Sequence, residues 1–167
     1  MYLLCPTYPQ VLLFPAQADN NCIVESGKFR SASRLPALTY YDKLSGTSIW
    51  RCAQPGSGLF NKLSKEDVAL LRYIGMCNGN PKNIHHTVLI HDSRPKLNAQ
   101  AMQLKGGGYE SCGPDANYSN CKIKFADIDN IHAVRSCFEK MYALAFSSTS
   151  INDTQSWLVQ VDQTGYL

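Results

Sequence analysis

The fold of this chain of 167 residues is restricted most strongly by residues 87–110. They begin with a short apolar, β-branched run at residues 88–90, which predicts a buried strand. A polar turn follows and ends at Pro95, with Asp92 shortly before it, which is typical of strand exit and helix entry. The order therefore predicts a strand that leads directly into a helix.

The predicted helix covers residues 97–105, which are mostly strong helix formers. Helical spacing places Leu97, Ala101 and Leu104 on one face. Three glycines at 106–108 then predict the end of the helix, because glycine adopts the positive φ that a C-terminal cap requires.

Before this stretch, residues 38–41 and 47–50 are rich in β-branched and aromatic residues. The five residues between them have turn chemistry, with Gly46 near the end, so the pair predicts an antiparallel hairpin. Residues 8–16 are bracketed by prolines and are expected to be an edge strand or a linker, whereas residues 17–27 fit either a loop or a short helix.

A second helix is predicted after Ser64, an N-cap residue with the acidic Asp67 at the third helical position. Its apolar face carries Leu70, Leu71, Ile74 and Cys77, and residues 79–81 are expected to stop it. Further on, residues 122–126 predict a strand, residues 131–146 a helix, and residues 154–167 the start of another helix.

Strand, helix, strand and helix at this spacing indicate an α/β fold. The expected architecture is a central mixed sheet flanked by helices and preceded by the antiparallel hairpin, within roughly one domain. The net charge of +3, without a run of basic residues, predicts no nucleic-acid partner.

Seven cysteines without a Cys-x-x-Cys pair, and four histidines without a His-Glu-x-x-His pair, predict neither a zinc site nor a disulfide framework. No metal and no cofactor are therefore expected, and reduced cysteines indicate an intracellular protein. No apolar run approaches the roughly 20 residues of a membrane span, and no signal peptide is expected.

Three features of the sequence are candidate ligand sites. The glycines at 106–108 follow a helix rather than precede one, so a cap and hinge is a better interpretation than a phosphate cradle. Asp92 and Arg94 either pair with each other or leave Arg94 for an anion, and structural pairing is favoured. His132, at the start of a predicted helix, suits binding or capping, and capping is favoured.

Cysteine-based phosphatase chemistry requires an arginine six residues after a thiolate that attacks phosphate. No cysteine of this chain has arginine at that position, and a Gly-x-Ser-x-Gly serine motif is also absent. The 167 residues are therefore expected to be catalytically silent by themselves.

Several separate motifs nevertheless converge on one family, and they run from about Tyr8 to the C-terminus. They are Lys28-Phe29-Arg30-Ser31, Arg34-Leu35-Pro36-Ala37-Leu38, Arg51-Cys52-Ala53-Gln54-Pro55, Lys65-Glu66-Asp67, Asp92-Ser93-Arg94-Pro95, Asn98-Ala99, Gly106-Gly107-Gly108-Tyr109-Glu110, Tyr118-Ser119-Asn120 and Asn130-Ile131-His132. In this order the chain resembles the N-terminal half of a myotubularin phosphatase domain, with a lean towards the subgroup of myotubularin-related proteins six, seven and eight.

The resemblance implies a fragment of a phosphoinositide 3-phosphatase that acts on phosphatidylinositol 3-phosphate and the 3,5-bisphosphate. It implies a cytoplasmic protein, peripheral on endosomal membranes, that contacts a phosphoinositide headgroup, a membrane surface and a myotubularin-family partner. The family's upstream lipid-binding domain and its downstream catalytic half, with the nucleophilic loop, have no counterpart in residues 1–167.

By the same resemblance, Asn130 and Ile131 are the expected substrate-binding residues, and no catalytic residue is expected within the chain. A third headgroup contact, an asparagine in the family, falls on Met102, which lacks an amide. The alternative function is therefore a non-catalytic adaptor, or pseudophosphatase, that binds an active relative.

Overall fold

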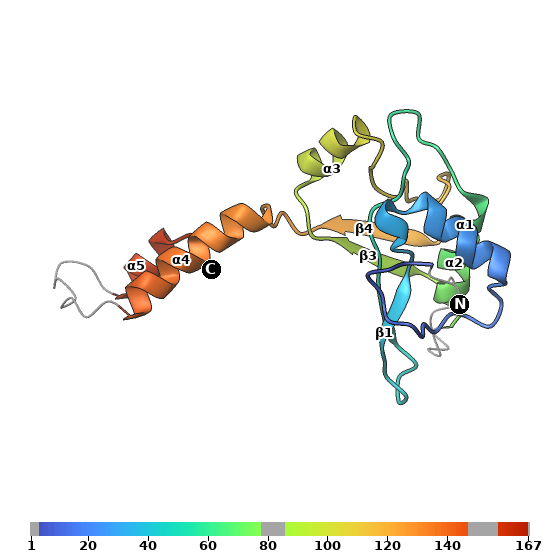
Figure 1. Cartoon of the computed structure of the whole chain (residues 1–167), viewed down its shortest axis with the longest axis horizontal. Helices are drawn as coiled ribbons and strands as arrows, with labels where there is room; N and C mark the ends of the chain where they lie inside the picture. The colour runs from blue at the N-terminus through green and yellow to red at the C-terminus, as the bar shows by residue number, and fades with distance from the viewer. Residues whose placement is uncertain (1–3, 78–85, 147–156, 167) are drawn as a thin grey trace. The chain divides into compact units, whose positions relative to one another are not determined.

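The computed structural model describes residues 4–77, 86–146 and 157–166. The chain divides into an N-terminal unit, Met1–Ala126, and a C-terminal unit, Asp127–Leu167. Figure 1 shows the elements of each unit.

The predicted hairpin is confirmed by β1 (Ala37–Tyr41) and β2 (Ser48–Arg51), which pair antiparallel. Its turn is held by Asp42, whose carboxylate accepts hydrogen bonds from the backbone N–H groups of Leu44 and Ser45. Gly46 supplies the positive φ of 70° that closes the turn. Turn chemistry therefore determined this element locally.

The second pair consists of β3 (Val88–Asp92) and β4 (Cys121–Phe125), which are parallel and in register from Val88 opposite Cys121. The predicted α/β class, with an antiparallel hairpin and a parallel pair, is confirmed. The two pairs form separate two-stranded sheets in the described part of the chain. The strand expected to be buried is half-buried on one face and exposed on the other, where Leu89 is 66% exposed.

Two helices cover the core of the N-terminal unit: α1 (Asn20–Phe29) and α2 (Lys65–Met76), which pack on each other. A short 3₁₀ turn, η1 (Ser31–Ser33), follows α1, so the helical alternative for residues 17–27 holds. Ser64 caps α2 by accepting a hydrogen bond from the backbone N–H of Asp67, as predicted. The predicted stop at 79–81 lies outside the described residues, and α2 ends at Met76. The buried cluster consists of Cys22, Leu35, Leu70, Leu71, Ile74, Tyr118 and Cys121.

The third helix, α3 (Lys96–Gln103), forms where the sequence predicts it. The face that Leu97 and Leu104 share points to solvent, because Leu97 is 78% and Leu104 is 72% exposed. Ala99, on a different side of the helix, is fully buried instead. A small alanine allows the helix to approach the unit closely, whereas the leucines face outward.

Residues 8–16 form no strand, so the linker alternative holds for this segment. Its backbone turns at Tyr8, whose N–H donates to the carbonyl of Cys5. Phe14 packs against the edge of the buried cluster. Flanking prolines cannot donate ladder hydrogen bonds, which explains why this apolar run does not join either sheet.

The C-terminal unit contains α4 (Ile131–Phe146) and α5 (Trp157–Gln163), and both helices were predicted. Aromatic contacts along α4 join Phe138 with Tyr142 and Tyr142 with Phe146, while Phe138 also contacts Tyr166. Val161 of α5 is the buried hydrophobic residue of this unit among those described. No helix within the described ranges is long and apolar enough to cross a membrane.

Candidate functional site

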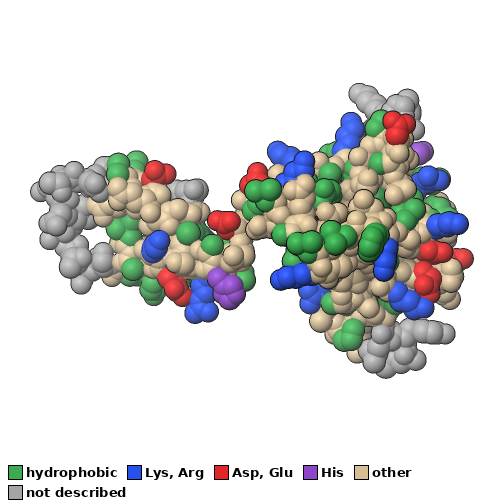
Figure 2. All heavy atoms as spheres, turned by 90° about the horizontal axis from the view of Figure 1, so that it is seen from above, with side chains coloured by type: hydrophobic (Ala, Val, Ile, Leu, Met, Phe, Trp, Pro, Cys, Tyr) green, Lys and Arg blue, Asp and Glu red, His purple; other side chains and the backbone are tan. Residues whose placement is uncertain are grey.

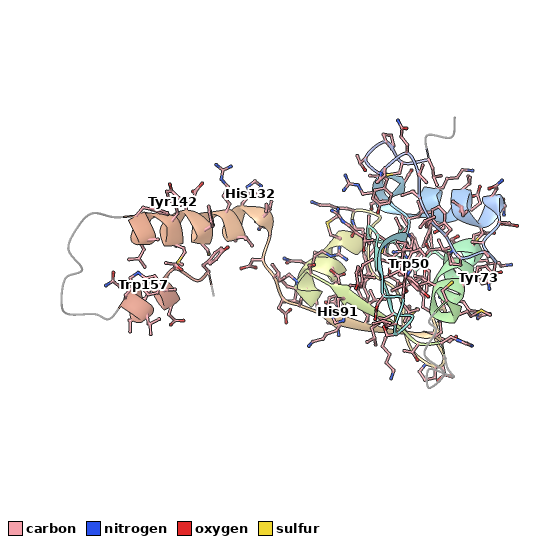
Figure 3. All side chains as sticks on the ribbon, turned by 90° about the horizontal axis from the view of Figure 1, so that it is seen from below. Trp50, Tyr73, His91, His132, Tyr142 and Trp157 are labelled. Atoms are coloured by element: carbon pink, nitrogen blue, oxygen red, sulfur yellow. The ribbon has the colours of Figure 1, made fainter. Side chains whose placement is uncertain are left out.

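A pocket of about 380 Å³ lies at the carboxyl end of β3. Ligands of α/β proteins tend to bind beyond the carboxyl ends of parallel strands. Figure 3 labels His91 at this end of the strand. The lining residues are Cys52, Ala53, Gln54, Ile90, His91, Asp92, Ser93, Arg94, Met102 and Glu110.

One wall of the pocket is held by the ion pair between Arg94 and Asp92. The Arg94 guanidinium donates from Nε to Oδ1 at 2.9 Å and from Nη2 to Oδ2 at 2.6 Å. It also donates to Oε1 of Gln54 at 2.6 Å and to the carbonyl of Gly108 at 2.8 Å. The predicted structural pairing is confirmed, and Arg94 joins three separate segments around the pocket.

This pairing gives Asp92 a stabilising role that depends on pH. Burial pushes the pKa of Asp92 upward, but the hydrogen bonds and charge of Arg94 outweigh burial and leave the pKa below its ordinary value. A lowered pKa in the folded state stabilises the fold above the unfolded value of about 4, and this stabilisation is lost as the pH falls below it.

We therefore expect Asp92→Asn to lower the free energy of unfolding at pH 7 and to weaken its dependence on pH below about 5. Urea unfolding measured from pH 7 down to pH 3 checks this expectation. The matched control is Asp162→Asn, which changes an exposed aspartate of the C-terminal unit. An unchanged pH dependence in Asp92→Asn would contradict the role given to the ion pair.

Behind the pocket lies a buried charged network centred on Arg30. Its guanidinium donates to both carboxylate oxygens of Asp67, at 2.8 and 2.7 Å, and to Oε1 of Glu110 at 2.6 Å. The side chains of Arg30 and Asp67 are fully buried, and that of Glu110 is 6% exposed. Glu110 also lines the pocket, so the network fixes one of its walls.

Asp67 receives two further hydrogen bonds, from the hydroxyl of Ser26 at 2.6 Å and from that of Tyr118 at 2.7 Å. Burial acts to raise its pKa, but the charge and hydrogen bonds of Arg30, together with the two hydroxyls, lower it below the ordinary value. Burial and the neighbouring carboxylate raise the pKa of Tyr118, so its phenol remains a donor at neutral pH. No described buried side-chain nitrogen or oxygen atom lacks a hydrogen-bond partner.

The three glycines after α3 join this scaffold and form no phosphate cradle. The N–H groups of Gly106 and Gly107 donate to carbonyls at the end of the helix, and the N–H of Gly108 donates to Oε1 of Gln54. All three amides are therefore engaged within the protein. Gly108 has φ +150°, and a side chain there would overlap the hydroxyl of Ser57.

The pocket contains one cysteine, Cys52, whose sulfur accepts a hydrogen bond from Arg30 at 3.3 Å. The residue as a whole is exposed, but local desolvation of the sulfur raises the pKa of this thiol despite the lowering effect of the Arg30 charge. A thiol with a raised pKa is a weak nucleophile at neutral pH. Cys52 is therefore not an activated thiol.

The predicted substrate-binding residues lie in the C-terminal unit. Asn130 is exposed, and its Oδ1 accepts hydrogen bonds from the backbone N–H groups of His132 at 2.9 Å and Ala133 at 3.2 Å. Asn130, rather than His132, therefore caps α4. Ile131 is 73% exposed. Their role in binding a headgroup stays a prediction.

Met102, which stands where the family has an asparagine, lines the pocket from α3. Gln54 and Glu110 line it as well, but only the family motifs mark them in the sequence, because their partners are distant along the chain. Among the described residues, no three His, Cys, Asp or Glu side chains are grouped to hold a metal ion.

The family model of the myotubularin-like phosphatase domain matches residues 1–167. The chain is 41% identical to human phosphatidylinositol-3,5-bisphosphate 3-phosphatase MTMR6, over 99% of this chain and 25% of that protein. It is 40% identical to mouse phosphatidylinositol-3-phosphate phosphatase MTMR7, over 99% of this chain and 24% of that protein. It is 39% identical to bovine phosphatidylinositol-3,5-bisphosphate 3-phosphatase MTMR2, over 94% of this chain and 23% of that protein.

The chain thus spans about a quarter of the length of these curated relatives. The match to the family model nevertheless covers every residue of the chain. The ordered motifs, the α/β fold and this match agree, and the chain belongs to the myotubularin-like phosphatase domain family.

Proposed function

We propose that this chain forms the substrate-recognition part of a phosphoinositide 3-phosphatase, which removes the 3-phosphate of phosphatidylinositol 3-phosphate and the 3,5-bisphosphate. The observation that carries the proposal is the pocket at the carboxyl end of β3, whose walls are fixed by two sets of ion pairs. The names of the relatives MTMR6 and MTMR7 specify these two lipids.

The proposal assigns recognition, and not bond cleavage, to these 167 residues, because none of their cysteines is followed six positions later by arginine. Asn130 and Ile131 are the proposed headgroup contacts. The cap of α4 occupies Oδ1 of Asn130, so its amide nitrogen is the group that would donate to a phosphate oxygen. Cytoplasmic, peripheral association with endosomal membranes belongs to the same proposal.

A titration of the chain with the soluble dibutanoyl form of phosphatidylinositol 3-phosphate tests the proposal. We expect saturable binding by calorimetry, no binding of dibutanoyl phosphatidylinositol, and about tenfold weaker binding for Asn130→Ala, because one hydrogen bond to a charged group is lost. Asn117→Ala, at another exposed asparagine, is the matched control. The same samples are expected to release no phosphate.

Met102 favours one alternative, a non-catalytic adaptor that binds an active family member. Met102 lines the pocket at the position where the resemblance implies an asparagine. Its thioether is only a weak hydrogen-bond acceptor, whereas an amide both donates and accepts. Met102→Asn is therefore expected to tighten headgroup binding. If neither the chain nor Met102→Asn binds the lipid, whereas the chain binds an active relative, the adaptor function replaces the proposal.

A further inference from the structure

The outer face of α3 is apolar and has no partner within the described residues of the N-terminal unit. Leu97, Ala101 and Leu104 share this face, and both leucines are more than 70% exposed. Ala99 already anchors the helix from its buried side. The two leucines are therefore not needed to hold α3 in place, and their exposure calls for another explanation.

The loop between β2 and α2 presents two more apolar side chains beside α3. Phe60 is 88% and Leu59 is 60% exposed. The loop is held against the end of α3, because the N–H of Gly58 donates to the carbonyl of Gly107 at 2.8 Å and Nε2 of Gln103 donates to Oδ1 of Asn61 at 3.4 Å. The loop and α3 lie on the upper side of the N-terminal unit in Figure 1, and Figure 2 shows this side from above.

The loop is folded on itself, so its tip is presented by ordered backbone. The N–H of Lys62 donates to the carbonyl of Ser57 at 2.7 Å, and that of Asn61 donates to the carbonyl of Gly58. We call the exposed side chains of Leu59, Phe60, Leu97 and Leu104 the apolar tip. It combines one loop and one helix that are joined by hydrogen bonds.

The charged side chains of the loop and the helix that carry the apolar tip are all lysines. Lys62, Lys96 and Lys105 are exposed, and residues 57–63 and 96–109 contain no aspartate or glutamate. Lysine is depleted in the cores of protein interfaces, whereas aromatic and leucine side chains flanked by lysine are typical of surfaces that bind anionic lipid bilayers. Figure 2 shows hydrophobic side chains on this side, with lysine and arginine around them and aspartate or glutamate side chains towards the margins.

We propose that the apolar tip enters the interface of an anionic lipid bilayer, with Lys62, Lys96 and Lys105 at the level of the lipid phosphates. Hydrophobic burial supplies attachment, and the lysines supply attraction to anionic lipid. Met102, on the same helix, lines the pocket. The surface would thus bring the pocket close to the bilayer, although binding through the apolar tip requires no headgroup in the pocket.

Sedimentation of the chain with lipid vesicles tests this surface separately from the headgroup pocket. The vesicles contain phosphatidylcholine with or without 30% phosphatidylserine and no phosphoinositide, so a failure here leaves the proposed recognition of the headgroup untouched. We expect binding to the anionic vesicles that weakens as salt is raised. The double variant Leu59→Asp/Phe60→Asp is expected to bind at least about tenfold more weakly.

The matched control is Leu44→Asp, because Leu44 is 99% exposed at the tip of the β1–β2 hairpin. It is expected to bind vesicles within about twofold of the unchanged chain. All substituted side chains are exposed, so the melting temperatures are expected to stay alike and to exclude misfolding.

A second measurement reports insertion directly. Phe60→Trp, in a background with Trp50→Phe and Trp157→Phe, is expected to shift its emission to shorter wavelength when anionic vesicles are added, whereas Leu44→Trp in the same background is not. Equal vesicle binding by the double variant and the unchanged chain would overturn the proposal. So would the absence of vesicle binding together with self-association that the double variant abolishes.

Discussion

Replacing Asp67 with alanine is expected to lower the free energy of unfolding of the N-terminal unit by about 3 to 5 kcal/mol, because it removes one partner of a buried ion pair. The Arg30 guanidinium would then keep its charge, fully buried, with Glu110 as its remaining carboxylate. Ser26 and Tyr118 would each lose the acceptor of a hydroxyl hydrogen bond. Domains of this size are typically stable by only about 5–15 kcal/mol, so most of the margin is at stake.

Urea unfolding followed by the fluorescence of Trp50, in a Trp157→Phe background, measures this loss. The matched control is Glu25→Ala on α1. Its ion pair with Lys28 has the same 2.6 Å length as the shortest contact of Arg30, but its side chains are 38% and 66% exposed. Such a pair contributes about 0.2 to 1 kcal/mol at most. A loss below about 1 kcal/mol for Asp67→Ala would contradict the central place given to the network.

Asp67→Asn tests the contribution of the side chain's charge separately from that of its volume. The amide keeps the volume of the carboxylate, but it neutralises the charge opposite Arg30 and adds donors where Arg30 already donates. We expect it to be destabilising in the same direction as alanine. A near-neutral effect would mean that packing around Asp67, and not its charge, stabilises this part of the unit.

Replacing Leu70 with alanine is expected to cost about 2 to 5 kcal/mol, because it leaves a cavity in a packed core. Leu70 is fully buried on α2 and belongs to the cluster that includes Leu35 and Ile74. The same urea experiment measures the loss.

Leu97→Ala is the matched control, with the same chemical change on α3 at a side chain that is 78% exposed. We expect an effect within about 0.5 kcal/mol. The pair also separates two interpretations, because helical spacing places each leucine on an apolar face of its helix, and the structure buries only Leu70. A large loss for Leu97→Ala would show that α3 packs through its outer face after all.

Local signals predicted the elements well where the physical cause is itself local. The cap of α2 depends on Ser64 and Asp67, three residues apart, and the hairpin turn depends on Asp42 and Gly46. The pairing of Asp92 with Arg94 spans two residues and was favoured from the sequence. In each of these cases the interacting atoms belong to neighbouring residues, so the sequence already contains both partners side by side.

The helical faces show where this reasoning stops. The spacing of Leu97, Ala101 and Leu104 is as amphipathic as that of α2, but no core lies on their side of α3. Periodicity says which residues share a face, and it cannot say what the face contacts. For the same reason, residues 8–16 have the composition of a strand but find no ladder to join.

The candidate site belongs mostly to the tertiary structure. The sequence marks Asp67 as an N-terminal helix residue, but its carboxylate turns inward to Arg30, 37 positions away, and Arg30 reaches Glu110 across 80 positions. No periodicity or spacing rule connects residues so far apart. In the sequence, only the family motifs contain all three residues.

The sequence by itself determined the α/β class, the positions of most helices and strands, and the family, because these follow from local propensity and from ordered motifs. The tertiary structure alone decided which of the apolar helix faces are buried, which charges far apart in the sequence meet, and that Met102 lines a pocket with Gln54 and Glu110. The physical reason is desolvation: a charge such as that of Arg30 is tolerated in the core only where folding brings carboxylates to it, and that meeting is a property of the whole unit.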